Sequence, residues 1–373
     1  MTTIYLVRHA EAEGNLYRIA QGHDDSNLTP RGWRQVRAVE RRFADIHVDA
    51  VYSSDLYRTC ATAGAVFKPK GLPLHRTTAL REICVGAWER NTWGDIYQIW
   101  PEEVESFGKE PKKWFVEGAE RPEDVLERVR KAVEEIAAAH PDQTVALFSH
   151  GYAIRLLLAH LQGIPLEDFG TSPIGCNTAV SCLEAENGEM RVVFRDDDSH
   201  LKTPEYLAED KGARRAGTLE SGLYYRPVQL PEQKEEFLRF AALCWKESGE
   251  TAPFNSEGLL QKAERGQPLL AYSLGEAVGL IQLGAEDGSI DLLIVGEEYR
   301  NRGFGTQMIG QAVYRWRAQG CELLHISVPA DKAARSFFAG NGFVAAEEQD
   351  GRLLLEKDTS FLPEYLGRAD TAE

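Results

Sequence analysis

The fold is decided by the stretch IYLVRHAEAEGN, which runs from Ile4 to Asn15 near the start of the chain. A short run of strand-forming apolar residues stops at Arg8 and His9, and acidic residues follow. In an open α/β sheet, ligands bind in the crevice beyond the carboxyl ends of the strands. A strand that ends in Arg8 and His9 therefore predicts an anion site that contains a nucleophile. A polar strand end without function is the simpler alternative.

The composition is that of an acidic globular protein with more than one domain. The 373 residues carry a formal net charge of −16, and 43% of them are hydrophobic. At about 150 residues per domain, this length predicts two or three domains. The negative charge argues against a nucleic acid or an anionic membrane as partner. A site for an anionic substrate must then concentrate positive charge locally, and Arg8 is the first candidate.

The cysteines and the apolar stretches bear on location and on metals. The six cysteines are scattered, without a C-x-x-C pair or a matching histidine cluster. This spacing predicts reduced thiols rather than disulfides or a metal site. The chain enters a strand at once, which leaves no room for a signal peptide, and its most apolar later stretch, AIRLLLAHL, is too short to span a bilayer. We expect a soluble cytoplasmic protein without a membrane partner.

Strand-like and helix-like segments alternate through the first half of the chain. Strands are expected near residues 4–7, 48–53 and 144–150, and helices over residues 28–45, 55–67, 121–140 and 151–161. Two more strand-like segments, near Val180 and Val193, close the unit. Such alternation is typical of a mostly parallel sheet covered on both faces. We predict a doubly wound α/β domain over residues 1–198.

The periodic pattern fails over residues 199–222, which we interpret as a linker with room for one short helix. Beyond it, the pattern predicts a helix over 231–248, a hairpin that turns near Gly275, and a strand, glycine turn and helix over 290–320. A strand and a helix follow, and residues 358–373 form a weakly patterned tail. Residues 223–357 are therefore expected to form a second, mixed α/β domain.

Two histidines far apart in sequence are expected to converge in the first domain. His9 and His150 each follow a predicted strand, and Arg58 follows another. Together with Arg8 they would form a cationic pocket for phosphate, because guanidinium groups match phosphate oxygens bidentately. A histidine whose second ring nitrogen is held by a hydrogen bond can act as a nucleophile. The departing alcohol then needs a proton, which Glu82 could supply.

Five sequence blocks, in order, resemble the histidine phosphatase superfamily, whose fold is shared with phosphoglycerate mutases. VRHAEAEGN resembles the signature R-H-G-E-x-x-x-N, with Ala10 where glycine is usual. QGHDDSNLTPRG, SSDLYRTCATA, LREICVGAWE and ALFSHG match the later blocks. The resemblance covers residues 1 to about 200. It implies a phosphoglycerate mutase-like fold and a small phosphomonoester as substrate, without a cofactor.

The resemblance also implies roles for individual residues. His9 would be the phosphorylated nucleophile and Glu82 the acid and base, with His150 as the third catalytic residue. The residues implied in phosphate binding are Arg8, Asn15, Arg58 and His150. The stretch GAWER and the short path from it to the next long helix resemble the phosphatase branch, so hydrolysis is favoured. Phosphoryl transfer of the mutase type remains the alternative.

A glycine turn in the second half carries the pattern R-x-x-G-x-G at Arg300, Gly303 and Gly305, between a strand and a helix. Glycines there let backbone amides approach phosphate oxygens, and the helix N-terminus adds partial positive charge. By itself this motif is weak, because glycine turns before helices are common for steric reasons.

In its context of hairpin, strand, turn and helix, residues 223–357 resemble a GNAT-type N-acetyltransferase domain. The resemblance implies acetyl-CoA as cofactor and a small amine as acceptor. Main-chain groups of the strand and the following loop would bind acetyl-CoA. These groups belong to Leu293, Ile294, Val295, Arg300, Asn301, Arg302, Gly303, Phe304, Gly305 and Thr306. Asp331 would lie near CoA, at a position where the family often has asparagine.

One departure puts acetyl transfer in question. Phe338 stands where the family often has a tyrosine that protonates the leaving thiolate, and phenylalanine cannot donate a proton. Glu297 and Glu298 could act as general bases, although acidic residues beside such a loop are more often simply solvated. The alternatives are a non-catalytic acyl-CoA sensor that modulates the phosphatase, and a degenerate packing module. The sequence indicates no oligomeric state.

Overall fold

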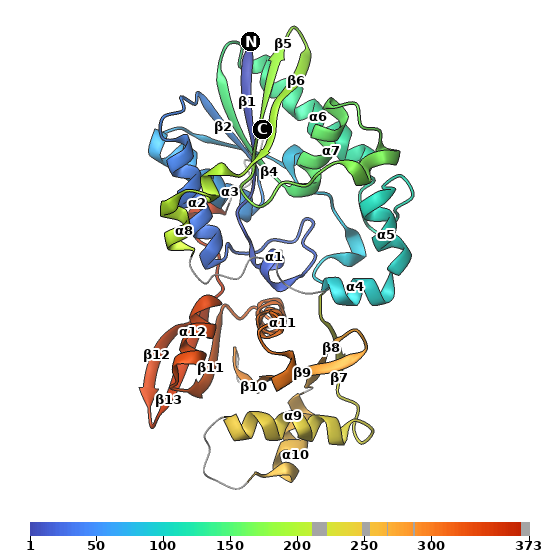
Figure 1. Cartoon of the computed structure of the whole chain (residues 1–373), viewed down its shortest axis with the longest axis vertical. Helices are drawn as coiled ribbons and strands as arrows, with labels where there is room; N and C mark the ends of the chain where they lie inside the picture. The colour runs from blue at the N-terminus through green and yellow to red at the C-terminus, as the bar shows by residue number, and fades with distance from the viewer. Residues whose placement is uncertain (211–221, 248–253, 267, 286–287, 367–373) are drawn as a thin grey trace.

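The computed structural model describes residues 1–210, 222–247, 254–266, 268–285 and 288–366. Figure 1 shows two parts stacked along the long axis of the molecule, with the large sheet above and the two smaller sheets below. Residues 211–221 of the expected linker and residues 367–373 of the expected tail lie outside the described residues.

The upper part is built on one mostly parallel sheet. Its strands occur in the order β3-β2-β4-β1-β5-β6, in which β1 to β4 are parallel and β5 and β6 form an antiparallel edge. The bounds are β1 (Thr2–Arg8), β2 (Ala50–Ser54), β3 (Leu74–Thr77), β4 (Thr144–Ser149), β5 (Val180–Glu186) and β6 (Glu189–Asp197). The predicted doubly wound α/β fold is confirmed.

Alternation of side chains along β1 creates two apolar layers. Ile4 and Leu6 pack in one core cluster with residues of α6 (Pro122–Ala139) and α7 (Gly151–Leu161). Val7 points to the other face and packs with residues of α2 (Pro30–Phe43) and α3 (Tyr57–Lys70). Because successive side chains of a strand face opposite sides, a strand covered on both faces is apolar nearly throughout. Figure 1 shows the two helix pairs on opposite sides of the sheet.

Local signals place the helix starts. Thr29 caps α2, since its hydroxyl oxygen accepts a hydrogen bond from the backbone N–H of Gly32, and Pro30 occupies the first turn. The remaining helices of this part are α1 (Glu13–Tyr17), α4 (Trp93–Ile99), α5 (Pro101–Lys109) and α8 (Pro204–Glu209). The short 3₁₀ segments are η1 (Thr78–Leu80), η2 (Gly86–Trp88), η3 (Leu166–Thr171) and η4 (Ser199–Leu201).

The lower part contains two antiparallel sheets, in the orders β10-β9-β8-β7 and β11-β13-β12. The strands are β7 (Tyr224–Pro227), β8 (Leu269–Ser273), β9 (Glu276–Leu283), β10 (Ile290–Val295), β11 (Leu323–Pro329), β12 (Val344–Gln349) and β13 (Arg352–Asp358). The helices are α9 (Lys234–Glu247), α10 (Ser256–Gly266), α11 (Phe304–Ala318) and α12 (Lys332–Gly340), with η6 (Glu297–Tyr299) and η7 (Pro363–Tyr365). The two sheets touch at a parallel bridge between Ser289 and His325.

Segments outside the two predicted domains pack on the upper part. Arg31 and Arg34 of α2 both pair with Asp210, which follows α8. After β13 the chain returns to the upper part, where the ring of Tyr365 is only 5% exposed and packs in the core cluster that contains Tyr57. The described parts of the expected linker and tail are therefore tied to the first domain by charge pairs and aromatic burial.

Candidate active site

The carboxyl ends of the parallel strands point toward the lower part of the molecule (Figure 1). In the pairing of β1 with β4, Arg8 lies opposite Ser149. The residue that follows each of these two strands is a histidine, so the register places His9 beside His150. Their ring centroids are 5.2 Å apart. The structure thus brings the two predicted histidines together at the expected edge of the sheet.

His9 is held with one ring nitrogen turned toward the backbone. Its Nδ1 lies 2.7 Å from the carbonyl oxygen of Ala10, which can only accept a hydrogen bond. Nδ1 therefore carries the proton, and Nε2 keeps its lone pair. Burial, followed by the charges of Arg58 and Arg8, lowers the pKa of His9 well below its ordinary value of 6.5. A neutral imidazole with a free Nε2 is the form required of a nucleophile.

His150 is fully buried, and its Nε2 lies 2.9 Å from the hydroxyl oxygen of Ser54. Its Nδ1 is buried without a hydrogen-bond partner among the described residues. Burial and the neighbouring charge of Arg58 lower the pKa of His150 well below 6.5. Ser54, the last residue of β2, was missed by sequence reasoning, although it directly follows the strand expected over residues 48–53 and precedes the predicted Arg58 by four residues.

Both predicted arginines are anchored by backbone carbonyl groups. The Nη1 of Arg8 donates a hydrogen bond to the carbonyl oxygen of Gly175 at 2.5 Å. Arg58 is 1% exposed, and it donates to the carbonyl oxygens of Gly22 at 2.8 Å and Asp24 at 2.9 Å. The Nε of each arginine is buried without a partner in the described part of the chain. These N–H groups are available to an anion that enters the site.

Asn15 lies on α1, close to the end of β1. Its Oδ1 accepts a hydrogen bond from the N–H of Ala12 at 3.0 Å and one from Nδ2 of Asn177 at 3.3 Å. The same Nδ2 of Asn177 donates to the carbonyl oxygen of His9 at 3.0 Å. Asn177 therefore links His9, the predicted nucleophile, to Asn15, which is predicted to bind phosphate. It lies in an irregular segment before β5, where no local pattern indicates a function.

Glu82 contacts the helix that follows His150. Its carboxylate oxygens accept hydrogen bonds from the backbone N–H groups of Tyr152 at 3.1 Å and Ala153 at 3.0 Å, in the first turn of α7. The N-terminus of a helix favours a negatively charged group. These contacts hold the Glu82 carboxyl beside His150, within the field of Arg8.

The glycine loop of the lower part leads from β10 into α11. Gly303 has a φ of 87° and is the N-cap of α11, a conformation that favours glycine. Gly305 is restricted by packing, because a Cβ there would lie 2.9 Å from the Phe337 ring. Arg300 donates to the carbonyl oxygen of Val295 at 3.2 Å, which closes the loop. The first-turn N–H groups of α11 follow directly, and Thr306 is buried among them.

The two departures from the acetyltransferase pattern have structural roles here. The side chain of Asp331 accepts a hydrogen bond from the N–H of Ala334 at 2.8 Å and so caps α12. Phe338 is 5% exposed and makes edge contacts with Phe337 and Phe343 in the core of the lower part. Helix capping explains Asp331 and core packing explains Phe338, so neither residue needs a catalytic role.

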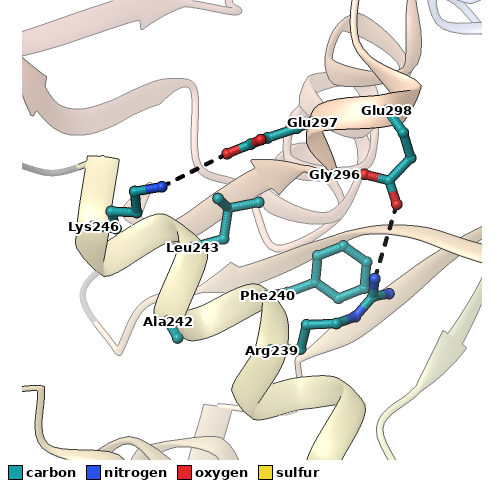
Figure 2. A pocket seen from close by; sticks show the side chains of 8 residues that line it. All are labelled: Arg239, Phe240, Ala242, Leu243, Lys246, Gly296, Glu297 and Glu298. Carbon is teal, nitrogen blue, oxygen red and sulfur yellow. Dashed lines mark ion pairs between the residues drawn. The ribbon is translucent and has the colours of Figure 1, made fainter.

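A hollow of about 340 Å³ lies between α9 and the segment that precedes the glycine loop (Figure 2). The carboxylates of Glu297 and Glu298 each face a cation across it, with Lys246 at 4.0 Å and Arg239 at 3.9 Å. Phe240 forms its apolar floor. The four charged side chains are more than half exposed, so these pairs contribute little to stability.

The fold and the two buried histidines between arginines define a class of α/β enzymes that handle phosphate esters. The chain belongs to the histidine phosphatase superfamily (branch 1), whose model matches residues 4–198, slightly more than half of its length. It also carries an acetyltransferase (GNAT) domain, matched over residues 246–352. The suspected fusion of the two families is confirmed.

Relatives that match the first domain are named as phosphatases or as mutases. "Phosphoserine phosphatase 1" of Hydrogenobacter thermophilus is 32% identical over 202 residues, which are 54% of this chain and 95% of that protein. A "Probable phosphoglycerate mutase" of Escherichia coli is 30% identical over 44% of this chain and 77% of that protein.

Two solved structures resemble the same domain. YhfR of Bacillus stearothermophilus is 32% identical, with a TM-score of 0.53 over 54% of this chain and all of that chain. A mycobacterial glucosyl-3-phosphoglycerate phosphatase, solved with VO3, is 26% identical with a TM-score of 0.50, over 52% of this chain and 99% of that chain.

The described residues contain neither a candidate membrane span nor a candidate metal site. No helix among them is long and apolar enough to cross a membrane. Within the same residues, no group of three or more histidine, cysteine or acidic side chains is arranged to hold a metal ion.

Proposed function

We propose that the first domain is a phosphomonoesterase that hydrolyses a small phosphorylated metabolite through a phosphohistidine on His9. The observation that carries this proposal is the hydrogen bond from Nδ1 of His9 to the carbonyl oxygen of Ala10. It leaves Nε2 unprotonated at the end of β1, beside the charges of Arg58 and Arg8. An isolated polar strand end would have no reason to hold a neutral histidine in this way.

The reaction runs in two displacements. Nε2 of His9 attacks phosphorus and forms an N–P bond, while the P–O bond to the alcohol breaks and Glu82 gives a proton to the departing oxygen. Water then attacks the phosphohistidine, Glu82 takes its proton, and phosphate leaves with the bonding pair returned to Nε2. Arg8, Arg58 and His150 stabilise the charge on the phosphoryl oxygens in both steps. Asn15 provides a further amide donor.

Hydrolysis is favoured over mutase-type transfer. The phosphoserine phosphatase matches the first domain over nearly its whole length, and the probable mutase matches over 77% of its own. Phosphoserine, phosphoglycerate and glucosyl-3-phosphoglycerate, named in these relatives, are all phosphate esters of small carboxylic acids or their conjugates. We infer a substrate of this class.

A screen of phosphorylated metabolites for released phosphate, with these compounds included, tests the proposal. With an active ester, brief exposure to labelled substrate followed by quenching should trap acid-labile phosphate on His9. Label on a serine, or no label with a good substrate, contradicts the nucleophile assignment. Transfer of phosphate to a second hydroxyl of the substrate rather than to water would favour the mutase.

We further propose that the second domain binds acetyl-CoA. The pyrophosphate would lie on the backbone N–H groups of Arg302 to Thr306, where Gly303 begins α11 with a positive φ. The pantetheine arm would bind along β10, which lies at the edge of its sheet and so has main-chain groups available beyond the bridge at Ser289. These features fit the cofactor, whose thioester would supply the acyl group.

A separate question is whether the second domain transfers the acyl group to a small amine. Phe338 is packed in the core and cannot protonate the thiolate, while Glu297 and Glu298 already face cations. We therefore keep two functions open for this domain: a slow N-acetyltransferase and an acyl-CoA sensor that modulates the phosphatase. Release of free CoA in the presence of a panel of small amines distinguishes them, since the sensor binds acetyl-CoA without consuming it.

A further inference from the structure

A buried carboxylate of the phosphatase domain is neutralised by the acetyltransferase domain. Glu13 lies four residues after His9, on α1, and its side chain is 2% exposed. Its Oε2 is 2.9 Å from Nη2 of Arg317, on α11. Its Oε1 is 3.3 Å from Nζ of Lys357, on β13. Both cations of this cluster therefore come from the second domain.

The two helices that carry these charges are in close contact. Leu16 and Tyr17 of α1 belong to the apolar cluster that forms the core of the lower part, together with Met308 and Val313 of α11. Gly310 of α11 permits the approach, because a Cβ there would lie 2.4 Å from the Cβ of Tyr17. Figure 1 shows α1 directly above α11, between the large sheet and the lower part.

The segment from Ala10 to Asn27, which contains α1, includes one residue of the proposed phosphatase site and contacts two others. The carbonyl oxygen of Ala10 accepts a hydrogen bond from Nδ1 of His9, and the carbonyl oxygens of Gly22 and Asp24 accept hydrogen bonds from Arg58. Asn15 is itself part of this segment. Whatever fixes the segment therefore fixes both the nucleophile and an arginine of the phosphate site.

The far end of this segment is secured by the chain just beyond β13, together with Arg317 of the second domain. Nδ2 of Asn27 donates to the carbonyl oxygen of Thr359 at 2.9 Å, and Nη2 of Arg317 donates to the same oxygen at 2.9 Å. A buried carboxylate is costly unless it is paired, and removing one partner leaves the other charge uncompensated. A helix of five residues cannot form without such tertiary support.

We propose that Arg317 of the acetyltransferase domain is a positioning residue for the phosphatase reaction, an inference that rests on the proposed phosphatase activity. It acts through Glu13, whose charge it neutralises, and so keeps the Ala10–Asn27 segment in the geometry that orients His9 and Arg58. The two domains form a single phosphatase unit. Helix α11 begins at the proposed acyl-CoA loop, so one helix borders both sites.

The test uses the full chain with orthovanadate as the probe of the phosphate site. Arg317→Met, which removes the charge but keeps much of the volume, should raise the dissociation constant of vanadate about tenfold, equivalent to about 1.4 kcal/mol. With an aryl phosphate, KM should rise and kcat should fall. Arg317→Lys should restore most of the affinity. The matched control is Arg315→Met, on an exposed position of the same helix, which should leave both values unchanged.

Glu13→Gln tests the same ion pair by removing the negative charge that Arg317 contacts, and it should weaken vanadate binding in the same way. The double variant Glu13→Gln with Arg317→Met should bind vanadate no more weakly than the worse single variant, because both changes break one interaction. Measurements well below the melting temperature separate this effect from a loss of stability, which changes the folded fraction but not the affinity of the folded protein.

Two results overturn the inference. One is a folded Arg317→Met protein with wild-type vanadate affinity and kinetics. If that variant does not fold, the other is a folded Glu13→Gln protein with wild-type affinity and kinetics. Failure of the wild-type chain to bind vanadate and to hydrolyse any phosphate ester overturns the phosphatase proposal itself and is seen before any variant is made.

Discussion

The proposed phosphatase site and the proposed acyl-CoA loop differ in the groups that would bind phosphate. At the first site, side chains do so from the interior: His9, Arg58 and His150 are at most 4% exposed. At the second, backbone N–H groups at the start of α11 would do so, and Asn301 beside them is exposed. Bond-breaking benefits from charges preorganised away from water, whereas binding a pyrophosphate needs only the shape of a loop. The first site should therefore be sensitive to side-chain chemistry and the second to backbone conformation.

The largest effect should come from removing the nucleophile. His9→Ala should abolish phosphatase turnover, because alanine cannot form the N–P bond. Released phosphate measures the activity, and an unchanged circular dichroism spectrum checks the fold. Stabilisation of the full chain by acetyl-CoA should persist in this variant. Turnover that survives the substitution would identify another nucleophile.

Glu82→Gln should have the next largest effect, and one that depends on the leaving group. General acid catalysis contributes about 10²–10⁴-fold, so turnover of alkyl phosphates should fall by about that factor. Aryl phosphates need little protonation and should be affected much less. The amide can still accept a hydrogen bond from one of the α7 N–H groups, which limits the structural change. An equal loss with both kinds of ester would indicate that Glu82 only supports α7.

Arg58→Ala tests the buried charge without removing the nucleophile. It should weaken the binding of inorganic phosphate or vanadate by about 1.5–3 kcal/mol, the usual range for hydrogen bonds to charged groups. Titration calorimetry measures the change. Arg37→Ala, on an exposed position of α2, is the matched control. Unaltered phosphate affinity in Arg58→Ala would mean that this guanidinium only supports the loop through its hydrogen bonds to the carbonyl oxygens of Gly22 and Asp24.

Gly303→Val tests the backbone site. A ligand selective for the folded state stabilises it by about 2.7 kcal/mol at a hundredfold excess over its dissociation constant. Acetyl-CoA should therefore raise the melting temperature of the full chain, and Gly303→Val should remove this shift, because a β-branched residue disfavours the φ of 87° and blocks close approach to phosphate. Vanadate binding serves as the control and should be retained, because Arg317, which contacts Glu13, lies near the other end of α11. A well-folded wild-type chain that shows no shift would favour the packing-module interpretation.

The smallest expected effect is a pH dependence that comes from buried histidines of the upper part. Burial lowers the pKa of His200 to about 4, and the pKa values of His9 and His150 also lie well below 6.5. Below pH 6.5 the unfolded chain binds protons at these residues while the folded chain does not, so the free energy of unfolding falls as the pH drops. His200 alone should account for roughly 2 kcal/mol between pH 6.5 and 5.

Denaturant unfolding at several pH values measures this effect. His200→Gln should make the dependence over pH 5 to 6.5 shallower, with His9 and His150 still contributing, while His47→Gln, on an exposed position, should leave it unchanged. Equal slopes in the wild-type chain and in His200→Gln would contradict the neutral assignment of His200.

Much of the architecture could be predicted because its signals are local. The apolar run before Arg8, the Thr29–Pro30 start of α2 and the glycine turn at Gly303 each depend on a few neighbouring residues. The signature around His9 and the strand before His150 are equally local, and the rule that parallel strands end at one edge of a sheet brought them together. The family matches over residues 4–198 and 246–352 confirm the two families that these signals indicated.

Contacts between distant segments could not be predicted in this way. Ser54 orients His150 from 96 residues away, and Asn177 reaches the carbonyl oxygen of His9 from 168 residues away. Arg317 and Glu13 are separated by 304 residues, and neither has a sequence environment that distinguishes it from an ordinary charge on a helix surface. Local periodicity reports which face of an element is buried, but not which partner buries it. The sequence thus specified two domains and the residues of one site, while the docking of α1 on α11, which pairs Glu13 with cations of the second domain, became visible only in three dimensions.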